Sequence, residues 1–311
     1  MKRRLLAVTL ALTAWVGGTV TGSLTSTPAA GLPILQVGRA HAEFQPALDG
    51  DEPIFVLLLG SDSRPGTPLD GGLADSIHVL GINPADGRGT LFGIPRDSWV
   101  PLASGGTNKI NAAMPAGGVK AQISTVEQLT GITMDYYALT GFPGFADAVD
   151  DIGGLTVDVP YGFQGYTTTF TEGEQRFTGH QALEYGRTRK SLTRGDFDRS
   201  LNQGTLLVSA LAQFRTEYAK DAGRAFDWMG AGLRNIETDV SIDELLLLAN
   251  LSLQVKPMNI TNLVATGSVG SEGGISVVYL SDSNQALWQD MTTDGYILPK
   301  AIPPEQTIQA S

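Results

Sequence analysis

Residues 54–62 read IFVLLLGSD, a continuous apolar run that ends in a polar turn. A short apolar run bounded by turn residues is typical of a β-strand that is buried on both faces. Gly60 and Ser61 separate the run from Asp62. We therefore expect a central strand over 54–59, with the carboxylate of Asp62 at the sheet edge where that strand ends.

The segments that follow predict one α/β domain. Residues 76–82 and 90–94 read as strands joined by a turn around Asp86-Gly87, so we expect a hairpin and a mixed sheet. Helices are expected over 119–129, 142–152, 179–187, 201–214, 242–255 and 282–291, and strands over 155–159, 262–266 and 275–280, with a loop or hairpin over 161–175. Strands that alternate with helices in this way are typical of an α/β fold.

The N-terminus predicts export or membrane anchoring. Lys2, Arg3 and Arg4 precede an uncharged apolar segment over 5–20. Positive charge before such a segment keeps the N-terminus in the cytoplasm and places the body outside it. Two outcomes stay open, an uncleaved single-pass anchor, which we favour, and cleavage near Ala42. We divide the chain into a signal peptide or signal anchor (1–24), a linker (25–50), one large domain (51–295) and a C-terminal tail (296–311).

The charge balance and the missing residue types exclude several classes of protein. The chain carries 21 basic and 32 acidic side chains, a formal net charge of −11. From position 43 onward 17 basic side chains stand against 32 acidic ones, a net charge of −15. That balance argues against a nucleic-acid-binding protein, which neutralises phosphates with basic residues. The absence of cysteine excludes disulfides, a thiol nucleophile and thiolate-bound metals.

Two aspartates stand at strand ends. Asp62 follows the first strand, and Asp75 comes just before the strand over 76–82. If the two strands are neighbours, both carboxylates lie near one edge of the sheet. Two such carboxylates suit Mg²⁺, which is held by one or two carboxylates together with substrate phosphates. The alternative is that each aspartate caps its own turn.

A second candidate feature is a cluster of basic residues. Six of them lie within 24 positions: Arg176, Arg187, Arg189, Lys190, Arg194 and Arg199. Arginine binds phosphate through two parallel hydrogen bonds. Arg187 and Arg189 would point the same way on an extended segment, Arg199 and Gln203 share a helix face, and Arg96 follows a strand and could join them. A solvated basic face is the alternative. Carboxylates beside arginines describe a site for a pyrophosphate-like group.

At these residues the chain resembles the LytR-CpsA-Psr family of cell-wall ligases. Seven stretches carry the resemblance, in the family's order: LLLGSDSR (57–64), ADS (74–76), IPRDS (94–98), NKINAA (108–113), VDDIGGLTV (149–157), GHQALEYGRTR (179–189) and GDFDR (195–199). Each stretch alone is weak evidence for the resemblance, but all seven in this order are specific to the family.

The resemblance implies a mixed central sheet flanked by helices and a membrane-anchored enzyme whose body faces outward. Members of the family move a glycopolymer from a polyprenyl-pyrophosphate carrier to a muramic acid hydroxyl of peptidoglycan, with Mg²⁺ or Mn²⁺. The lipid tail occupies an apolar tunnel between sheet and helices. The implied partners are therefore the lipid-linked glycopolymer, peptidoglycan and the cytoplasmic membrane.

The family pattern also implies roles for single residues. Asp62 and Asp75 would hold the metal or assist the acceptor, and Arg96 would act with them in catalysis. The pyrophosphate would be held by Arg96, Lys109, Arg187, Arg189, Arg199 and Gln203. Two positions depart from the pattern, because Leu73 and Asn202 stand where the family usually has arginine.

Other functions stay open on the sequence alone. The same site could hydrolyse a polyprenyl pyrophosphate, with water as the acceptor. The chain could also bind a polyprenyl phosphate or glycan without turnover, which the two missing arginines favour. Transcription regulation, a label that this family has carried, fits poorly with an acidic, exported body that has no helix-turn-helix pattern.

Overall fold

The structure is a computed structural model that describes residues 35–41 and 52–302, except for positions 65, 222, 225–226, 229 and 231–235. The predicted signal or anchor over 1–24 lies outside these residues. Within them, no helix is both long enough and apolar enough to cross a membrane.

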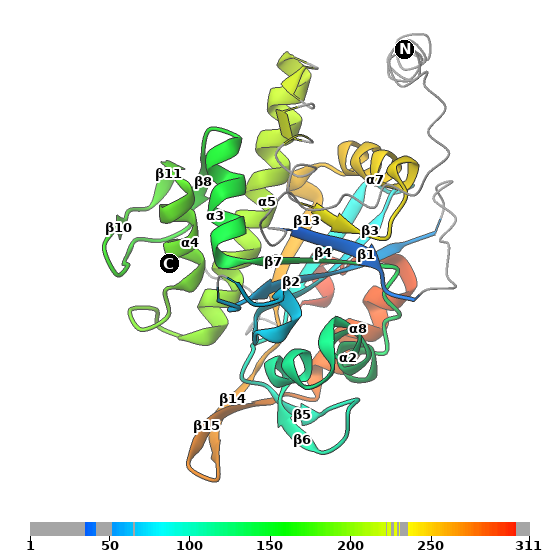
Figure 1. The fold of residues 1–311 in the computed structure, drawn as a ribbon, viewed down its shortest axis with the longest axis vertical. Coiled ribbons are helices and arrows are strands. Elements are labelled where there is room, and N and C mark those ends of the chain that lie inside the picture. Colours follow the sequence, from blue (N-terminus) through cyan, green and yellow to red (C-terminus); the bar gives the residue numbers. More distant parts are fainter. Residues whose placement is uncertain are drawn as a thin grey trace.

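The core of the fold is a seven-stranded sheet (Figure 1). In spatial order its strands are β12 (Ile236–Thr238), β1 (Leu35–Arg39), β7 (Tyr136–Gly141), β2 (Ile54–Ser61), β3 (Ala74–Asn83), β4 (Arg88–Gly93) and β13 (Ile260–Val264). β3 pairs antiparallel with β2 on one side and with β4 on the other. β2 pairs in parallel with β7, and β4 pairs in parallel with β13. The predicted hairpin and the predicted mixed sheet are both confirmed.

The apolar run of β2 lies between helices on both faces of the sheet, fully buried on one face and partly buried at Val56 and Leu58 on the other. Phe55, Leu57 and Leu59 pack in one core with the helices α2 (Ala113–Thr130) and α8 (Ser283–Asp294). Ile54 and Val56 point to the other face and pack with residues of α7 (Ile242–Gln254). Because side chains alternate along a strand, one apolar segment contacts both helix layers. The fold is therefore an α/β domain with helices on both faces of the sheet.

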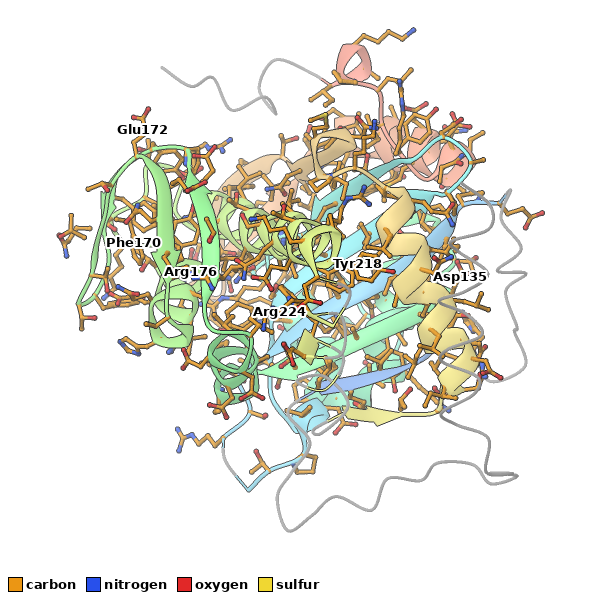
Figure 2. The ribbon with its side chains drawn as sticks, turned by 90° about the horizontal axis from the view of Figure 1, so that it is seen from above. Asp135, Phe170, Glu172, Arg176, Tyr218 and Arg224 are labelled. Atoms are coloured by element: carbon orange, nitrogen blue, oxygen red, sulfur yellow. The ribbon has the colours of Figure 1, made fainter. Side chains whose placement is uncertain are left out.

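A side lobe, residues 142–187, stands at one end of the sheet (Figures 1 and 2). It contains α3 (Phe142–Asp151), β8 (Leu155–Val159), β9 (Phe163–Gln164), β10 (Thr169–Phe170), β11 (Gly173–Phe177) and α4 (Gly179–Arg187). Buried aromatic rings, among them Phe170, Phe177 and Tyr185, form its own core. β9 and β10 are the hairpin expected within 161–175. The long helix α5 (Asp196–Lys220) lies between the lobe and the sheet and packs against β8, β4 and β13.

Two short ribbons and four single helical turns complete the described part of the chain. The ribbons are β5 (Trp99–Pro101) with β6 (Thr107–Lys109) and β14 (Gly267–Glu272) with β15 (Ile275–Leu280). The 3-10 turns are η1 (Leu69–Gly71), η2 (Ile110–Ala112), η3 (Pro257–Asn259) and η4 (Pro299–Ala301). Figure 1 shows the β14–β15 ribbon extending away from the sheet.

The expected domain boundaries at 51 and 295 need correction at both ends. Leu35–Arg39, placed in the linker, form β1, which pairs with β7 and β12. The Arg39 side chain fixes this strand, because its Nη2 atom donates to Glu244 Oε2, 2.5 Å away at the start of α7. At the other end Ile297 is buried and Ile302 packs on the same core, so the expected tail begins inside the domain.

Burial of an acid where β1, β2 and β7 meet predicts a pH dependence of stability. Burial raises the pKa of Asp135 to about 6, although its Oδ2 accepts a 2.7 Å hydrogen bond from Phe55 N. A raised carboxyl pKa contributes stability below pH ~4 that is lost as the pH rises through about 6. Asp135→Asn keeps an acceptor without the charge. We expect it to be more stable than the parent by on the order of 2 kcal/mol at pH 8 and equal near pH 4.

Urea unfolding at both pH values measures this difference. Asp290→Asn, on an exposed position of α8, is the matched control and should leave the pH dependence unchanged. If the stability of Asp135→Asn depended on pH as that of the parent does, the buried carboxyl of Asp135 would not be the cause of the pH dependence.

Candidate active site

Asp62 and Asp75 lie side by side where β2 and β3 meet. The pairing passes from Gly60–Ser76 to Ser61–Ala74, so Asp75 is the extra residue of a β-bulge. Bulges of this kind redirect a side chain next to functional sites. Asp62 continues the contact, since its backbone N–H donates to Leu73 O at 3.0 Å. The predicted juxtaposition of the two acids at one sheet edge is therefore what the structure has.

Arg96 and Arg199 converge on this edge from different elements. Arg96 follows β4, and its NH1 lies 2.5 Å from Asp75 Oδ1. Arg199 lies in the first turn of α5, where its NH2 is 2.7 Å from Asp196 Oδ1 and 3.4 Å from the Asp75 carbonyl oxygen. Asp196 also faces Arg96 Nε at 3.8 Å. Gln203, one turn after Arg199, donates to the carbonyl oxygens of Asp75 and Gly186, so the expected shared helix face is confirmed.

A fourth acid, Asp97, joins Lys109 and Arg189 to the site. Asp97 Oδ1 lies 2.8 Å from Lys109 Nζ, and its Oδ2 lies 3.9 Å from Arg189 NH1. Neither Asp97 nor Asp196 was among the predicted site residues. The sequence signals were present, because Asp97 follows Arg96 directly and Asp196 stands three positions before Arg199 on a helix.

Arg187 approaches the same edge from the side lobe. It is the last residue of α4, and its guanidinium lies 4.4 Å from the centre of the Phe142 ring. Phe142 begins α3 directly after Gly141, which pairs with Ser61 of β2. Helix α4 ends at Arg187, as predicted, and Thr188 is extended, so Arg187 and Arg189 lie on opposite sides of the helix end rather than on one extended segment.

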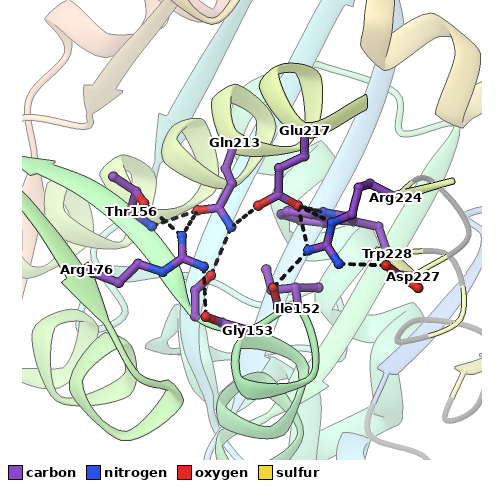
Figure 3. Close-up of polar contacts among 10 residues, drawn as sticks. Ile152, Gly153, Thr156, Arg176, Gln213, Glu217, Arg224, Asp227 and Trp228 are labelled. Carbon is purple, nitrogen blue, oxygen red and sulfur yellow. Dashed lines mark hydrogen bonds and ion pairs between the residues drawn. The ribbon is translucent and has the colours of Figure 1, made fainter. Parts of the chain in front are cut away.

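Arg176 belongs to a different set of contacts and is absent from this site (Figure 3). It donates to Thr156 Oγ1 at 2.8 Å and to Gln213 Oε1 at 2.9 Å, and so joins β11 and β8 to α5. Gln213 continues to Glu217, which pairs with Arg224 at 2.8 Å. Arg194 likewise pairs with Asp198, 2.7 Å away. The predicted cluster therefore divides: Arg176 and Arg194 make contacts away from the site, whereas Arg189 and Arg199 pair with acids that belong to it.

The site is only partly buried, since Arg199 is buried but Arg187 is exposed, and its basic side chains outnumber its acidic ones. Arg96, Lys109, Arg187, Arg189 and Arg199 carry five positive charges, against the carboxylates of Asp62, Asp75, Asp97 and Asp196. Burial acts to lower the pKa of Arg96, but the three acids Asp75, Asp196 and Asp97 together raise it above its ordinary value. Burial raises the pKa of Asp196, and Arg199 and Arg96 oppose that shift. Pre-oriented arginines in such a setting bind an anion with several oxygens.

The two departures from the family pattern have different surroundings. Leu73 is 36% exposed beside Asp62, and its backbone N–H donates to Asp62 Oδ1 at 2.7 Å. Asn202 is buried in α5, and its Nδ2 has no hydrogen-bond partner among the described residues. Leu73 thus occupies the rim of the site, whereas Asn202 points into the protein.

The donor set fits a divalent metal ion. Asp62 and Asp75 each engage only Oδ1 in the contacts described above, which leaves Oδ2 of both carboxylates on the same sheet edge. Mg²⁺ takes one or two carboxylates together with phosphate oxygens and water. Among the described residues no group of three or more potential ligands gathers, so a metal here would depend on the ligand for its remaining contacts.

A close approach of α5 to β4 places Arg199. A Cβ atom on Gly93 would lie 2.3 Å from Ser200 Oγ, so the helix seats directly on the glycine. His78 Nε2 lies 3.0 Å from the Ser200 carbonyl oxygen on the same surface. Burial lowers the pKa of His78 to about 4, so the ring is neutral at physiological pH and donates this hydrogen bond.

We expect Gly93→Ala to lower the free energy of unfolding by about 1–2 kcal/mol, because the new methyl group overlaps Ser200 Oγ. The double variant Gly93→Ala/Ser200→Ala removes that oxygen and should recover most of the loss. Gly71→Ala is the control, since a Cβ there meets no atom within 4 Å. Chemical denaturation measures all four proteins, and a double variant no better than Gly93→Ala would refute the contact as the cause.

Comparison with known proteins agrees with this geometry. The family model described as "LytR_cpsA_psr family" matches residues 34–293. The polyisoprenyl-teichoic acid–peptidoglycan teichoic acid transferase TagV of Bacillus subtilis is 33% identical over 227 residues, which are 70% of this chain and 57% of TagV. The chain thus matches a little over half the length of that relative.

Solved structures share the fold. The crystal structure of B. subtilis TagV has a TM-score of 0.65 at 30% identity, and the match covers 80% of this chain and 99% of that one. The B. subtilis protein TagT with bound octaprenyl pyrophosphate lipid has a TM-score of 0.61 at 19% identity, over 81% of this chain and 93% of that one. The family match over most of the chain and the identity to TagV establish that this protein belongs to the LytR-CpsA-Psr family.

Proposed function

We propose that this chain transfers a glycopolymer from a polyprenyl-pyrophosphate carrier to peptidoglycan, outside the cytoplasmic membrane. Residues 1–24 would anchor or export it. One observation carries the proposal: five basic side chains from four parts of the chain meet at one sheet edge beside two carboxylates. The name of TagV and the pyrophosphate lipid held by TagT are in keeping with this chemistry.

The basic residues would neutralise the pyrophosphate. Arg96 and Arg199 are held in place by Asp75 and Asp196, so their guanidinium groups are already oriented before a ligand arrives. Donors that are fixed beforehand stabilise the charge that develops on phosphate oxygens without a cost of reorganisation. Arg189, Lys109 and Arg187 are more exposed and would contact the outer oxygens.

The acceptor hydroxyl oxygen would attack the phosphorus that bears the sugar. A new P–O bond forms, the bond between the two phosphates breaks, and polyprenyl monophosphate leaves with the electron pair. The hydroxyl proton would pass to Oδ2 of Asp62 or Asp75, whichever carboxylate is not fully engaged by the metal. Mg²⁺ or Mn²⁺, held by these aspartates, would supply positive charge to the same phosphates.

Two other outcomes use the same site. With water as acceptor the chain would be a polyprenyl-pyrophosphate phosphatase. Without turnover it would be a binding protein, which the replacement of two family arginines by Leu73 and Asn202 favours. Product analysis separates all three activities.

We expect Arg189→Ala and Asp75→Asn each to reduce the kcat/KM of transfer by about 10²-fold or more, because each removes a contact at the transferred phosphate. The assay uses the full chain in detergent, a short-chain prenyl-pyrophosphate glycan and peptidoglycan fragments, with Mg²⁺ or EDTA. Mass spectrometry identifies the products. Lys120→Ala, on an exposed position of α2, is the matched control.

A phosphodiester-linked adduct that needs the metal supports transfer. Free phosphorylated glycan alone would assign a hydrolase, and donor binding without any product would assign a binding protein. Full activity of Asp75→Asn would show that the site residues are wrong.

The rim position of Leu73 allows a gain-of-function test. Leu73→Arg places a guanidinium beside Asp62, at the edge of the phosphate site. We expect donor KM to fall about 3- to 10-fold, the effect of one partly exposed charge-assisted hydrogen bond. Leu73→Met controls for size, and initial rates at varied donor concentration measure both variants. Unchanged KM for Leu73→Arg would place this position outside the donor site.

A further inference from the structure

The loop between β9 and β10 is held by one buried carboxylate. Glu184 of α4 accepts hydrogen bonds from the backbone N–H groups and hydroxyls of Thr167 and Thr168, among them Thr167 Oγ1 at 2.7 Å and Thr168 Oγ1 at 2.8 Å. Burial acts to raise the pKa of Glu184, but these four hydrogen bonds lower it to about 2. The carboxylate therefore stays charged and keeps the loop fixed at any physiological pH.

Two further contacts restrict the loop, residues 165–168. A Cβ on Gly165 would lie 2.6 Å from Glu184 Oε1, so only glycine lets the chain pass this close. The Ser191 hydroxyl donates to the Gln164 carbonyl oxygen and joins the loop to the segment after Arg189. A loop held this way loses little conformational freedom when a ligand binds.

The fixed loop presents an exposed aromatic ring beside the phosphate site. Tyr166 is 61% exposed, and its hydroxyl lies 3.5 Å from the carbonyl oxygen of Arg187. The Arg187 side chain in turn lies over Phe142, at the end of the sheet where Asp62 emerges. The Tyr166 hydroxyl thus lies against the main chain of Arg187, whose side chain reaches that end of the sheet.

The surroundings of this ring indicate the chemistry of its ligand. Residues 159–171 contain no charged side chain, so the surface suits a neutral group. On the same hairpin Gln164 and Thr169 are exposed, and Gln164 Oε1 accepts a hydrogen bond from Thr169 Oγ1 at 2.7 Å. An apolar face bordered by hydroxyl and amide groups matches a pyranose, which has a C–H face and an edge of hydroxyls.

We propose that Tyr166 forms a saccharide subsite, in which the ring stacks on a sugar joined to, or about to be joined to, the phosphate in the site. The inference rests on the proposed function, since it takes the adjacent arginines to hold a phosphate. It assigns sugar recognition to the side lobe and phosphate binding to the sheet edge.

The test compares two probes that differ only in a sugar. Binding of geranyl pyrophosphate and of geranyl-pyrophosphoryl N-acetylglucosamine to the full chain in detergent is measured by calorimetry, without turnover. For Tyr166→Ala we expect about tenfold weaker binding of the sugar-bearing probe and unchanged binding of geranyl pyrophosphate. Tyr166→Phe should stay close to the parent, because it keeps the ring. Tyr279→Ala, an exposed tyrosine on the β14–β15 ribbon, is the control.

A third probe separates the two sources of the sugar. If Tyr166→Ala weakens binding of a peptidoglycan disaccharide instead, the subsite holds the acceptor. Equal loss for both prenyl probes, or no loss for any sugar, would overturn the proposal. Because binding is measured directly, a chain that discriminates sugars but makes no adduct would contradict the proposed transfer and leave the subsite standing.

Discussion

The carboxylate of Asp196 holds together two arginines that would otherwise repel each other. It lies 2.7 Å from Arg199 and 3.8 Å from Arg96, in a buried part of the molecule. Neither oxygen of Asp196 has a hydrogen-bond partner among the described residues, so the two arginines are what offsets its loss of water. Because Arg96 follows β4 and Arg199 lies in the first turn of α5, this side chain links the start of the helix to the end of the strand. Both arginines also contact Asp75, the extra residue of the bulge.

Local patterns of sequence were enough to predict most of the fold. The apolar run of β2, the hairpin of β3 with β4 and the long helices each carry their own periodicity. β1 and β7 were missed because their residues, LQVGR and YYALTG, are short and carry no pattern of their own. Both become strands through pairing with each other, and β7 also with β2, which is a tertiary effect. The domain boundary at 51 was wrong for the same reason.

Some residues of the site were likewise predictable from the sequence, and others were not. Residue type and order predicted which side chains gather, including Asp62, Asp75, Arg96 and Arg199. Their partners were not predictable, because Asp97 and Asp196 are ordinary acids in the sequence until folding places them against arginines. Arg176 shows the opposite case, since it falls within the basic cluster yet folding turns it toward Gln213. The sequence shows which residue types lie close together along the chain. Whether the Arg176 side chain points to the site or to Gln213 depends on how α5 packs.

The balance of charge explains why the arginines are paired in advance. The chain carries a net charge of −11, so its long-range field repels a polyanionic ligand. Attraction is then left to contacts within about 8 Å, the screening length at physiological ionic strength. At that range, geometry decides affinity: guanidinium groups already held by Asp75 and Asp196 can exchange one oxyanion for another with little movement. In a chain with this net negative charge, an uncharged and rigid surface such as the 165–168 loop can contribute to ligand recognition without adding to the repulsion.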